Sequence, residues 1–412
     1  MSNKKKLKNW DVIIVGAGAS GMVAGITAAR RGKSVLILEH MDKPGKKIFA
    51  TGNGKCNYTN AVMSADCYYG NRELVQVVLE QFGRDDALAF FREIGIFPKE
   101  KNGYYYPNSQ QASSMVEALC AEISRLGITL FTACKVQAIE AGKYGFDIIT
   151  TTGSYWGRQV IVATGLRAAP KLGSDGSILG VLKKMGHRFV PILPALCGFE
   201  ATGMPFRKVS GVRADVRLSL WVDGKQMKEE RGELQLADYG ISGIPVFQLS
   251  SPAVRGLYDQ KRVVVSIDFF PDLRISDLQE ELSRRFLRDK NRRTLEQSLC
   301  GLLNHKLIPV FLQKAGYSSG QDAATADSVV IQKIAAVMHD YPVELQKVRD
   351  FSCAQVCTGG IRTEDIDIHT LGSKIVPGLY FAGELLDVDG ICGGYNLQWA
   401  WASGFVAGNS IL

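Results

Sequence analysis

Four residues near the N-terminus have the types and spacing to bind a dinucleotide. Gly16, Gly18 and Gly21 form the pattern G-x-G-x-x-G, and Glu39 follows 18 positions after the last glycine. The first glycine permits a tight turn, the second has no side chain to hold a pyrophosphate away, and the third lets helix and strand pack closely. Glu39 can accept hydrogen bonds from a ribose diol. The pattern predicts a dinucleotide site but does not choose the cofactor, because methyltransferases share a related turn and acid.

The flanking sequence provides the elements that must position these residues. Residues 11–15 and 35–38 are short apolar runs typical of buried strands, and residues 22–31 have helical character. Ala19 and Ser20 then fall in the turn between strand and helix. The N-terminus of such a helix offers unpaired N–H groups and a partial positive charge to phosphates.

Composition limits the classes of protein to consider. The 412 residues allow two or three domains, and 46% hydrophobic with 22% charged residues is typical of a soluble globular protein. Part of the net charge of +8 lies in the opening MSNKKKLK, which we expect to be a solvated tail. Glycines interrupt the uncharged run 12–29, so we reject a signal peptide or membrane span and expect a cytoplasmic protein. The nine cysteines are scattered, so reduced thiols and no metal site are expected.

The segment after Glu39 predicts a functional loop followed by regular structure. Residues 41–60 are rich in Gly and Pro, and Lys46, Lys47 and Lys55 bring positive charge near the predicted phosphate site. We expect helices at 74–82, 85–94 and 112–126, and strands at 135–141, 144–151 and 158–165, from the periodicity of apolar residues. The last of these strands ends in Ala163, Thr164 and Gly165, where open α/β sheets bind ligands.

Residues 191–350 have a different texture. Short alternating runs predict a β subdomain over 191–275, with a hairpin turn at Asp223-Gly224, and 276–350 reads as mainly helical, with a capping box from Ser276 to Gln279. A basic cluster follows on the predicted helical part, and we interpret it as a solvated helix face rather than a nucleic-acid site: Arg284, Arg285, Arg288, Lys290, Arg292 and Arg293.

The C-terminal part repeats the opening pattern. A strand at 378–381 leads to Ala-Gly-Glu, and a glycine-rich turn leads into a helix over 395–407. We therefore expect one discontinuous α/β domain, residues 1–190 with 351–412, in which 191–350 is an insertion.

Four motifs resemble a bacterial family of FAD-containing oxidoreductases that includes aminoacetone oxidases and dehydro-bile-acid reductases. They are GAGASG at 16–21, ATGNGKCN at 50–57, GELQLADYGISG at 232–243 and the run from Gly378 to Gly408. In the second motif this chain has Lys55 where the family commonly has arginine, which keeps the charge. The resemblance implies a Rossmann-like FAD domain interrupted by a β-barrel-like part and a helical part, and it argues against a methyltransferase.

The resemblance also implies which residues contact FAD. The opening loop with Glu39 would hold the ADP half, the 50–57 loop would run along the cofactor, and the C-terminal motif would reach the ribityl chain and the flavin ring. The implied set is Gly16, Gly18, Ala19, Ser20, Gly21, Glu39, Lys47, Gly52, Gly54, Asn57, Val136, Ala163, Thr164, Gly165, Gly383, Glu384, Asn396 and Leu397.

The expected activity is an FAD-dependent oxidoreduction of a small organic molecule. A second G-x-G-x-x-G after a strand is missing, so NAD(P)H is expected only as a transient electron donor. Reduction of an activated C=C bond is our first hypothesis, and oxidation of a small amine by oxygen and an RNA-interacting flavoprotein are the alternatives. Tyr239 and Ser242 are the candidate polar contacts to substrate, with a structural turn as their equal alternative. The catalytic acid or base and the oligomeric state stay open.

Overall fold

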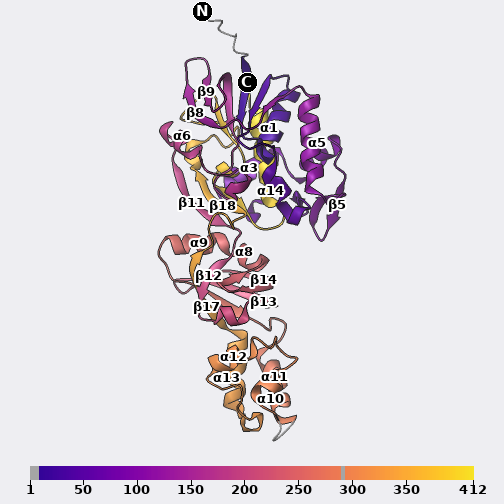
Figure 1. The fold of residues 1–412 in the computed structure, drawn as a ribbon, viewed down its shortest axis with the longest axis vertical. Helices are drawn as coiled ribbons and strands as arrows, with labels where there is room; N and C mark the ends of the chain where they lie inside the picture. The colour runs from indigo at the N-terminus through magenta and orange to yellow at the C-terminus, as the bar shows by residue number, and fades with distance from the viewer. Residues whose placement is uncertain (1–8, 289–292) are drawn as a thin grey trace, which may run out of the picture. The chain divides into compact units, whose positions relative to one another are not determined.

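The computed structural model describes residues 9–288 and 293–412 (Figure 1). The opening residues 1–8 and two members of the basic cluster, Lys290 and Arg292, lie outside this part. The described chain divides into two compact units, residues 1–194 with 351–412, and residues 195–350. The first unit thus combines an N-terminal and a C-terminal segment of the chain in one α/β structure.

The first unit is built on a mixed sheet whose central strands are parallel. The strand order is β7-β2-β1-β10-β9-β8, and β19 also pairs with β10. The strands β1, β2, β7 and β19 run parallel to their neighbours, whereas β9 is antiparallel to both β8 and β10. The strands are β1 (Trp10–Val15), β2 (Val35–Leu38), β7 (Thr129–Phe131), β8 (Val136–Ala141), β9 (Phe146–Thr150), β10 (Ser154–Val162) and β19 (Leu379–Phe381).

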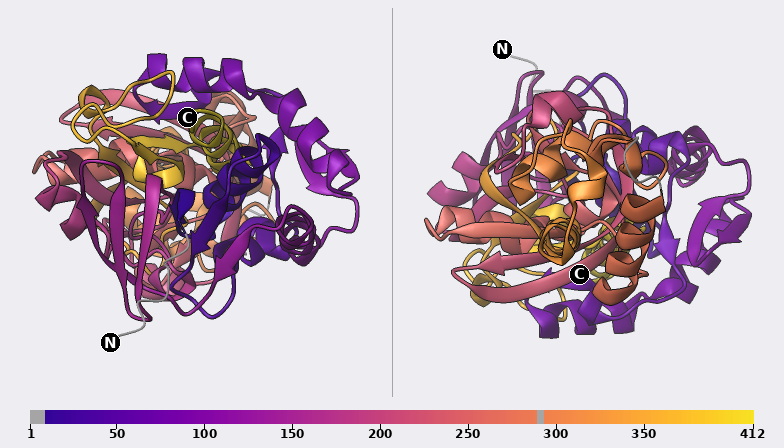
Figure 2. Two further views of the ribbon diagram at one scale, coloured as in Figure 1. Left: turned by 90° about the horizontal axis from the view of Figure 1, so that it is seen from above. Right: turned by 90° about the horizontal axis from the view of Figure 1, so that it is seen from below.

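Two helices from opposite ends of the chain lie side by side on this sheet. These are α1 (Ala19–Arg30) and α14 (Tyr395–Asn409). A Cβ built on Gly404 would lie 2.4 Å from the Ser20 carbonyl oxygen, and one built on Gly408 would lie 2.4 Å from that of Ala24. Since both helices advance by four residues between these contacts, they run parallel, and Figure 2 shows the yellow C-terminal helix beside the indigo N-terminal segments.

The remaining elements of the first unit are short strands and amphipathic helices. The helices near 72, 84 and 112 bury one apolar face, as predicted, each within two residues of the expected ends. These elements are α2 (Lys46–Phe49), β3 (Thr59–Asn60), β4 (Tyr68–Gly70), α3 (Arg72–Gln81), α4 (Arg84–Glu93), β5 (Pro98–Lys101), β6 (Tyr104–Pro107), α5 (Ala112–Arg125), α6 (Leu179–Lys184), β11 (Phe189–Ala195), β18 (Val356–Ile361) and β20 (Val388–Gly390).

The second unit is a six-stranded closed barrel with helices. Strand β13 buries every second side chain from Val216 to Val222, which is the alternation that the sequence shows. The predicted hairpin at Asp223-Gly224 is confirmed, with both residues in the left-handed region, as a type I′ turn requires. The strands are β12 (Phe199–Thr202), β13 (Arg213–Val222), β14 (Lys225–Ala237), β15 (Gly240–Ser242), β16 (Val263–Asp268) and β17 (Tyr341–Val348).

The helical part of this unit corrects two expectations. The predicted helical part, residues 276–350, is not helical to its end, because β17 closes the barrel between β12 and β16. Nor does Ser276 cap a helix, since α10 already begins at Ile275 and the Ser276 hydroxyl donates to Asp277. The helices are α7 (Phe206–Val209), α8 (Ile244–Gln248), α9 (Ser250–Tyr258), α10 (Ile275–Arg288), α11 (Leu295–Leu299), α12 (Ile308–Ala315) and α13 (Ser328–His339).

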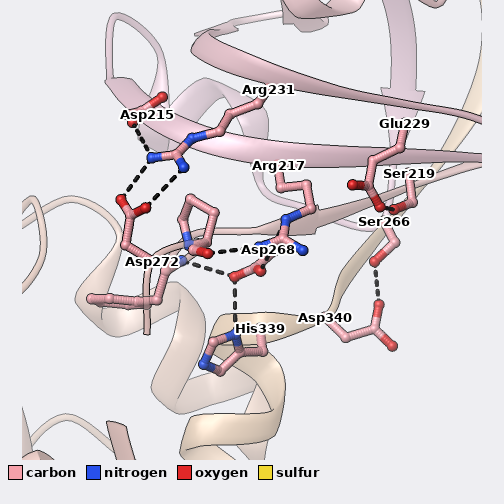
Figure 3. A network of polar contacts seen from close by, with 12 residues as sticks. Asp215, Arg217, Ser219, Glu229, Arg231, Ser266, Asp268, Asp272, His339 and Asp340 are labelled. Carbon is pink, nitrogen blue, oxygen red and sulfur yellow. Dashed lines mark hydrogen bonds and ion pairs between the residues drawn. The ribbon is translucent and has the colours of Figure 1, made fainter. Parts of the chain in front are cut away.

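Barrel and helices share one hydrophobic core, and polar contacts tie their edges together. His339, the last residue of α13, lies 3.0 Å through Nδ1 from an Asp268 carboxylate oxygen at the end of β16. Arg231 on β14 donates to Asp272 at 2.6 Å and to Asp215 at 3.2 Å (Figure 3). The His339 contact ties the end of α13 to β16, and the Arg231 contacts tie β14 to β13 and to the loop between β16 and α10.

Candidate functional site

The parallel strands bring the predicted nucleotide residues to one edge of the sheet. β1, β2, β10 and β19 all end at this edge, because parallel strands share their carboxyl ends. Four short segments therefore converge there: Gly16–Gly18, Glu39, Ala163–Gly165 and Ala382–Glu384.

The three glycines of the opening loop differ in what their missing side chains allow. A Cβ on Gly16 would lie 2.7 Å from the Ala163 carbonyl oxygen, and one on Gly21 would lie 1.9 Å from that of Gly16. Gly18 is different, because a Cβ there would have no heavy atom within 4 Å. Protein packing thus excludes side chains at Gly16 and Gly21 but leaves open space at Gly18. That space lies at the N-terminus of α1, where a phosphate group would find free N–H donors.

Glu39 is buried and orders the loop around it. One carboxylate oxygen accepts the Ala17 N–H at 2.7 Å, and the other accepts the Met41 N–H at 2.8 Å. The neighbouring His40 ring donates to the same carboxylate, which raises the pKa of His40 above its usual value. A carboxylate has about four acceptor positions, so Glu39 keeps capacity for a ribose diol. Its backbone carbonyl accepts the Cys134 N–H, which brings the chain toward Val136 at the start of β8.

Glu384 is a second carboxylate at this edge, and it bonds to residues of α2 and β18. Its Oε2 accepts from Lys47 Nζ at 3.0 Å, and its Oε1 accepts the Cys357 N–H at 2.6 Å. The space next to Gly165 is closed, because a Cβ there would lie 2.8 Å from Ser174 Oγ and 3.4 Å from Glu384 Oε2. The positive charge of Lys47 is thus paired with the Glu384 carboxylate. The Thr164 hydroxyl donates to the Gly165 carbonyl oxygen.

Gly383 lies directly against the first loop. It has a positive φ of 75°, and a Cβ there would lie 2.5 Å from Ser20 Oγ. Ser403 on α14 accepts the Gly383 N–H and donates to the Trp399 carbonyl oxygen, while Trp399 Nε1 donates to the Gly383 carbonyl oxygen. Sequence reasoning missed Ser403 and Trp399. The available signal was their spacing of four residues, which places both side chains on one face of the helix.

The glycine-rich loop at 51–57 is held by backbone geometry. Gly52 and Gly54 have φ of 55° and 81°, which only glycine adopts freely. In the amide orientation that satisfies both its ends, Asn57 donates to the Thr59 carbonyl oxygen and accepts the Gly394 N–H. Asn57 thus fastens the loop to the start of α14.

Of the two residues at the start of α14 that were predicted to contact FAD, one makes hydrogen bonds within the protein instead. Asn396 donates to the Gly390 carbonyl oxygen at 2.7 Å and accepts the Gly390 N–H at 2.9 Å. Its amide therefore fixes the turn before the helix. Leu397 is half-buried, and the first-turn N–H groups of Tyr395, Asn396 and Leu397 precede the first helical hydrogen bond, which Gln398 donates to Gly394.

Both candidate substrate residues lie in the second unit: Tyr239 directly precedes β15, and Ser242 is the last residue of that strand. The Arg349 guanidinium lies 4.4 Å from the Tyr239 ring centroid, and a Cβ on Gly198 would lie 3.2 Å from Tyr239 Oη. Both candidate side chains are half-buried. These contacts give Tyr239 a packing role in its own unit, and its role toward substrate stays a prediction.

Cys56 lies in a predicted cofactor motif, and Arg284 and Arg285 belong to the basic helix. Burial raises the pKa of Cys56 to about 12, so at neutral pH it is a thiol rather than a nucleophilic thiolate. Arg284 and Arg285 both pair with Glu281 on their own helix. Of the helices in residues 9–288 and 293–412, none has the length and apolar character of a membrane span.

A Rossmann-type sheet with an open glycine loop and an acid after its second strand defines a dinucleotide-binding protein. The chain belongs to the family described as HI0933-like protein Rossmann domain, which matches residues 10–410. It is an FAD-dependent oxidoreductase, as the family resemblance implied.

Two named relatives cover nearly the full chain. The chain is 40% identical to the 3-dehydro-bile acid delta(4,6)-reductase of Clostridium scindens, over 96% of this chain and 98% of the relative. It is 27% identical to the ribosomal RNA dihydrouridine synthase of Escherichia coli, over 98% and 99%. Among solved structures, a 3-ketosteroid-delta4-(5alpha)-dehydrogenase from Rhodococcus jostii RHA1 shares the fold with a TM-score of 0.51 and 16% identity, over 99% of this chain and 98% of that chain.

Proposed function

We propose that this protein uses NAD(P)H to saturate a C=C bond conjugated to a carbonyl in a small organic molecule, such as a dehydro-bile acid or a steroid-like enone. The observation that carries the proposal is the 40% identity to a bile-acid delta(4,6)-reductase over almost the whole of both chains. In the overall reaction, the hydride of NAD(P)H adds to the carbon β to the carbonyl, a proton adds at the α carbon, and NAD(P)⁺ is released.

The two named relatives support the reaction type because their names imply the same bond change. A delta(4,6)-reductase of a 3-dehydro bile acid saturates C=C bonds conjugated to the 3-oxo group. Dihydrouridine forms when the C5=C6 bond of uracil, conjugated to the C4 carbonyl, is saturated. Conjugation to a carbonyl is thus the shared chemical requirement, and the higher identity favours the small molecule as substrate.

We assign the ADP half of FAD to the edge formed by the glycine loop and Glu39. The open space at Gly18 would receive the pyrophosphate, with N–H donors from Ala19, Ser20 and Gly21. Glu39 would accept from the ribose, and Val136 would lie at the adenine. When bound, FAD supplies the two-electron redox chemistry.

The other assigned residues would hold the rest of the cofactor. Gly383 and Glu384 follow the end of β19, and Ala163 to Gly165 follow that of β10, so both backbones are positioned at the site edge by the sheet. The first-turn N–H groups of Tyr395, Asn396 and Leu397 would place a partial positive charge at the flavin pyrimidine ring. Lys47 and Asn57 would act by fixing Glu384 and Gly394, rather than by direct contact.

The deciding experiment is anaerobic stopped-flow absorbance of the yellow holoprotein. After mixing with NADH or NADPH, the flavin band should bleach, and a steroid 4-en-3-one acid should restore it. Bleaching by a primary amine but by neither nicotinamide would replace the proposal with the amine oxidase. Restoration by uridine-containing RNA but by no enone would favour the activity of the second relative.

A further inference from the structure

One face of the β5–β6 hairpin carries two lysines from β5 and two tyrosines from β6. Lys99 pairs with Tyr106 across the two strands, and Lys101 pairs with Tyr104. Residues two apart on a strand point to the same face, so all four side chains share it. Glu100 lies on the opposite face, where it faces Tyr105 and accepts the Gly103 N–H.

These four side chains line a pocket together with a third lysine, from the glycine-rich loop, and two amide residues of the hairpin region. The pocket has a volume of about 200 Å³, and Lys55 reaches it from the loop at 51–57. Its lining consists of Lys55, Lys99, Lys101, Asn102, Tyr104, Tyr106 and Gln110. Three cations and no carboxylate line this pocket, and burial raises the pKa of Tyr106, so its phenol stays neutral.

The three lysines have no carboxylate partner in the described residues. No ion pair within 4.0 Å joins Lys55, Lys99 or Lys101 to an acid anywhere in 9–288 or 293–412. By contrast, Lys47 of the same region is paired with Glu384. Like charges in one small pocket repel one another, so an anion bound among them would be stabilised.

The pocket adjoins the start of α14. A Cβ built on Gly393 would lie 3.0 Å from Tyr104 Cε1, so the Tyr104 ring lies directly against this glycine. Asn60 Nδ2 donates to the Gly393 carbonyl oxygen at 2.9 Å and fixes the contact. The next residue, Gly394, is the N-cap of α14, whose first turn is assigned above to the flavin ring.

We propose that this pocket is the subsite for an anionic group, a carboxylate, on the substrate. The inference rests on the proposed function and names the substrate class as enones that carry a negatively charged tail. A volume of about 200 Å³ is below the range of ~300–1,000 Å³ that holds a whole drug-sized ligand, so the pocket takes the tail and not the reacting ring. The tyrosine rings would cover the apolar carbons next to the carboxylate.

A small anion fits the observations better than a nucleic acid. The three unpaired lysines are gathered in one pocket, whereas Arg284 and Arg285 of the basic helix both pair with Glu281. Binding a polymer requires a track of cations along the surface.

The test compares a steroid 4-en-3-one acid with its neutral methyl ester, in the wild type and in K99A/K101A. Two readouts are used: KM in anaerobic turnover with NAD(P)H, and Kd by isothermal titration calorimetry with the oxidised holoprotein. For the acid, KM and Kd should each rise about tenfold in the variant, and 0.5 M NaCl should weaken wild-type binding similarly. For the ester, both values and kcat should stay unchanged.

The matched control is K143A/K225A, which removes two exposed lysines from other hairpin ends, one of them beside the Tyr144 ring. It should behave as the wild type, and flavin content should be equal in all three proteins. Equal affinity of the wild type for acid and ester, or no effect of K99A/K101A on the acid, would overturn the subsite while enone turnover persisted. If neither compound is turned over but the acid still binds through the lysines, the proposed function fails and the anion subsite stands. Lysine-dependent binding of single-stranded RNA without binding of the acid would overturn the subsite for small anions.

Discussion

At the scale of single residues, Gly18 separates cofactor binding from folding. Its missing side chain leaves space that the protein does not fill, whereas Gly16 and Gly21 are required by backbone contacts. We expect Gly18→Val to fold normally and to purify colourless, because the added methyl groups would occupy the proposed pyrophosphate position. The measurement is the ratio of flavin to protein absorbance, with circular dichroism to follow folding.

Gly320→Val is the matched control for this prediction. A Cβ on Gly320 also meets no heavy atom within 4 Å, and the residue lies in the second unit, outside the proposed cofactor edge. It should purify as yellow as the wild type. A yellow, stoichiometrically loaded Gly18→Val would contradict the assignment of the loop.

His187 makes the stability of the first unit depend on pH. Burial lowers its pKa, and its Nε2 lies 2.7 Å from Ser373 Oγ. The folded protein holds His187 neutral, so the unfolded chain takes up the proton first when the pH falls below ~6.5. This group's contribution is therefore present above that pH and lost as the pH falls toward the lowered folded value.

We expect the urea midpoint to fall less between pH 7.5 and pH 5.5 in His187→Asn than in the wild type. His369→Gln, which removes an exposed histidine, should follow the wild-type curve. An equal fall in His187→Asn and in the wild type would show that His187 does not contribute.

At the scale of elements, the site depends on the close packing of α1 against α14. Gly404 lies where a Cβ would be 2.4 Å from the Ser20 carbonyl oxygen, and backbone atoms cannot move aside as a flexible side chain can. We expect Gly404→Val to destabilise the protein by about 1–3 kcal/mol, as overpacked cores do. It should also lower FAD affinity, because α14 would shift from Ser20 and Gly383.

Thermal unfolding of the apoprotein and FAD titration would measure both effects. Gly180→Val, on helix α6 with no atom near the added Cβ, is the control and should change the melting temperature little. Unchanged stability in Gly404→Val would mean that the two helices are not packed as closely as described.

At the scale of the whole molecule, the proposed cofactor residues and the candidate substrate residues fall in different units. Every residue assigned to FAD lies within 1–194 or 351–412, and Tyr239 and Ser242 lie within 195–350. We expect a chimera that carries residues 195–350 of the bile-acid reductase relative to retain stoichiometric FAD and to change its preference among enones.

Flavin content and kcat/KM for a panel of enones would test the chimera. A well-folded chimera without flavin would place part of the cofactor site in the exchanged segment. Unchanged preference would assign substrate choice to the first unit, which contains the pocket lined by Lys55, Lys99 and Lys101.

The sequence by itself determined the nucleotide-binding half of this protein. The apolar runs at 11–15 and 35–38 form parallel strands, and the strand predicted at 158–165 is found as β10, which begins at Ser154 and ends at Val162. The glycine spacing predicts the turn at Gly16, because local sterics decide both features. The hairpin at Asp223-Gly224 followed for the same reason. Where the signal depended on one boundary, as at Ser276, the prediction was wrong.

Only the tertiary structure decided how distant segments complete the site. Asn57 with Gly394, Lys47 with Glu384, and Ser403 with Gly383 are pairs whose partners are far apart along the chain or lie on different elements. The return of β17 into the barrel and the gathering of Lys55 with Lys99 and Lys101 are of the same kind. Periodicity and spacing report contacts within an element, whereas these contacts arise from long-range packing, which no local pattern encodes.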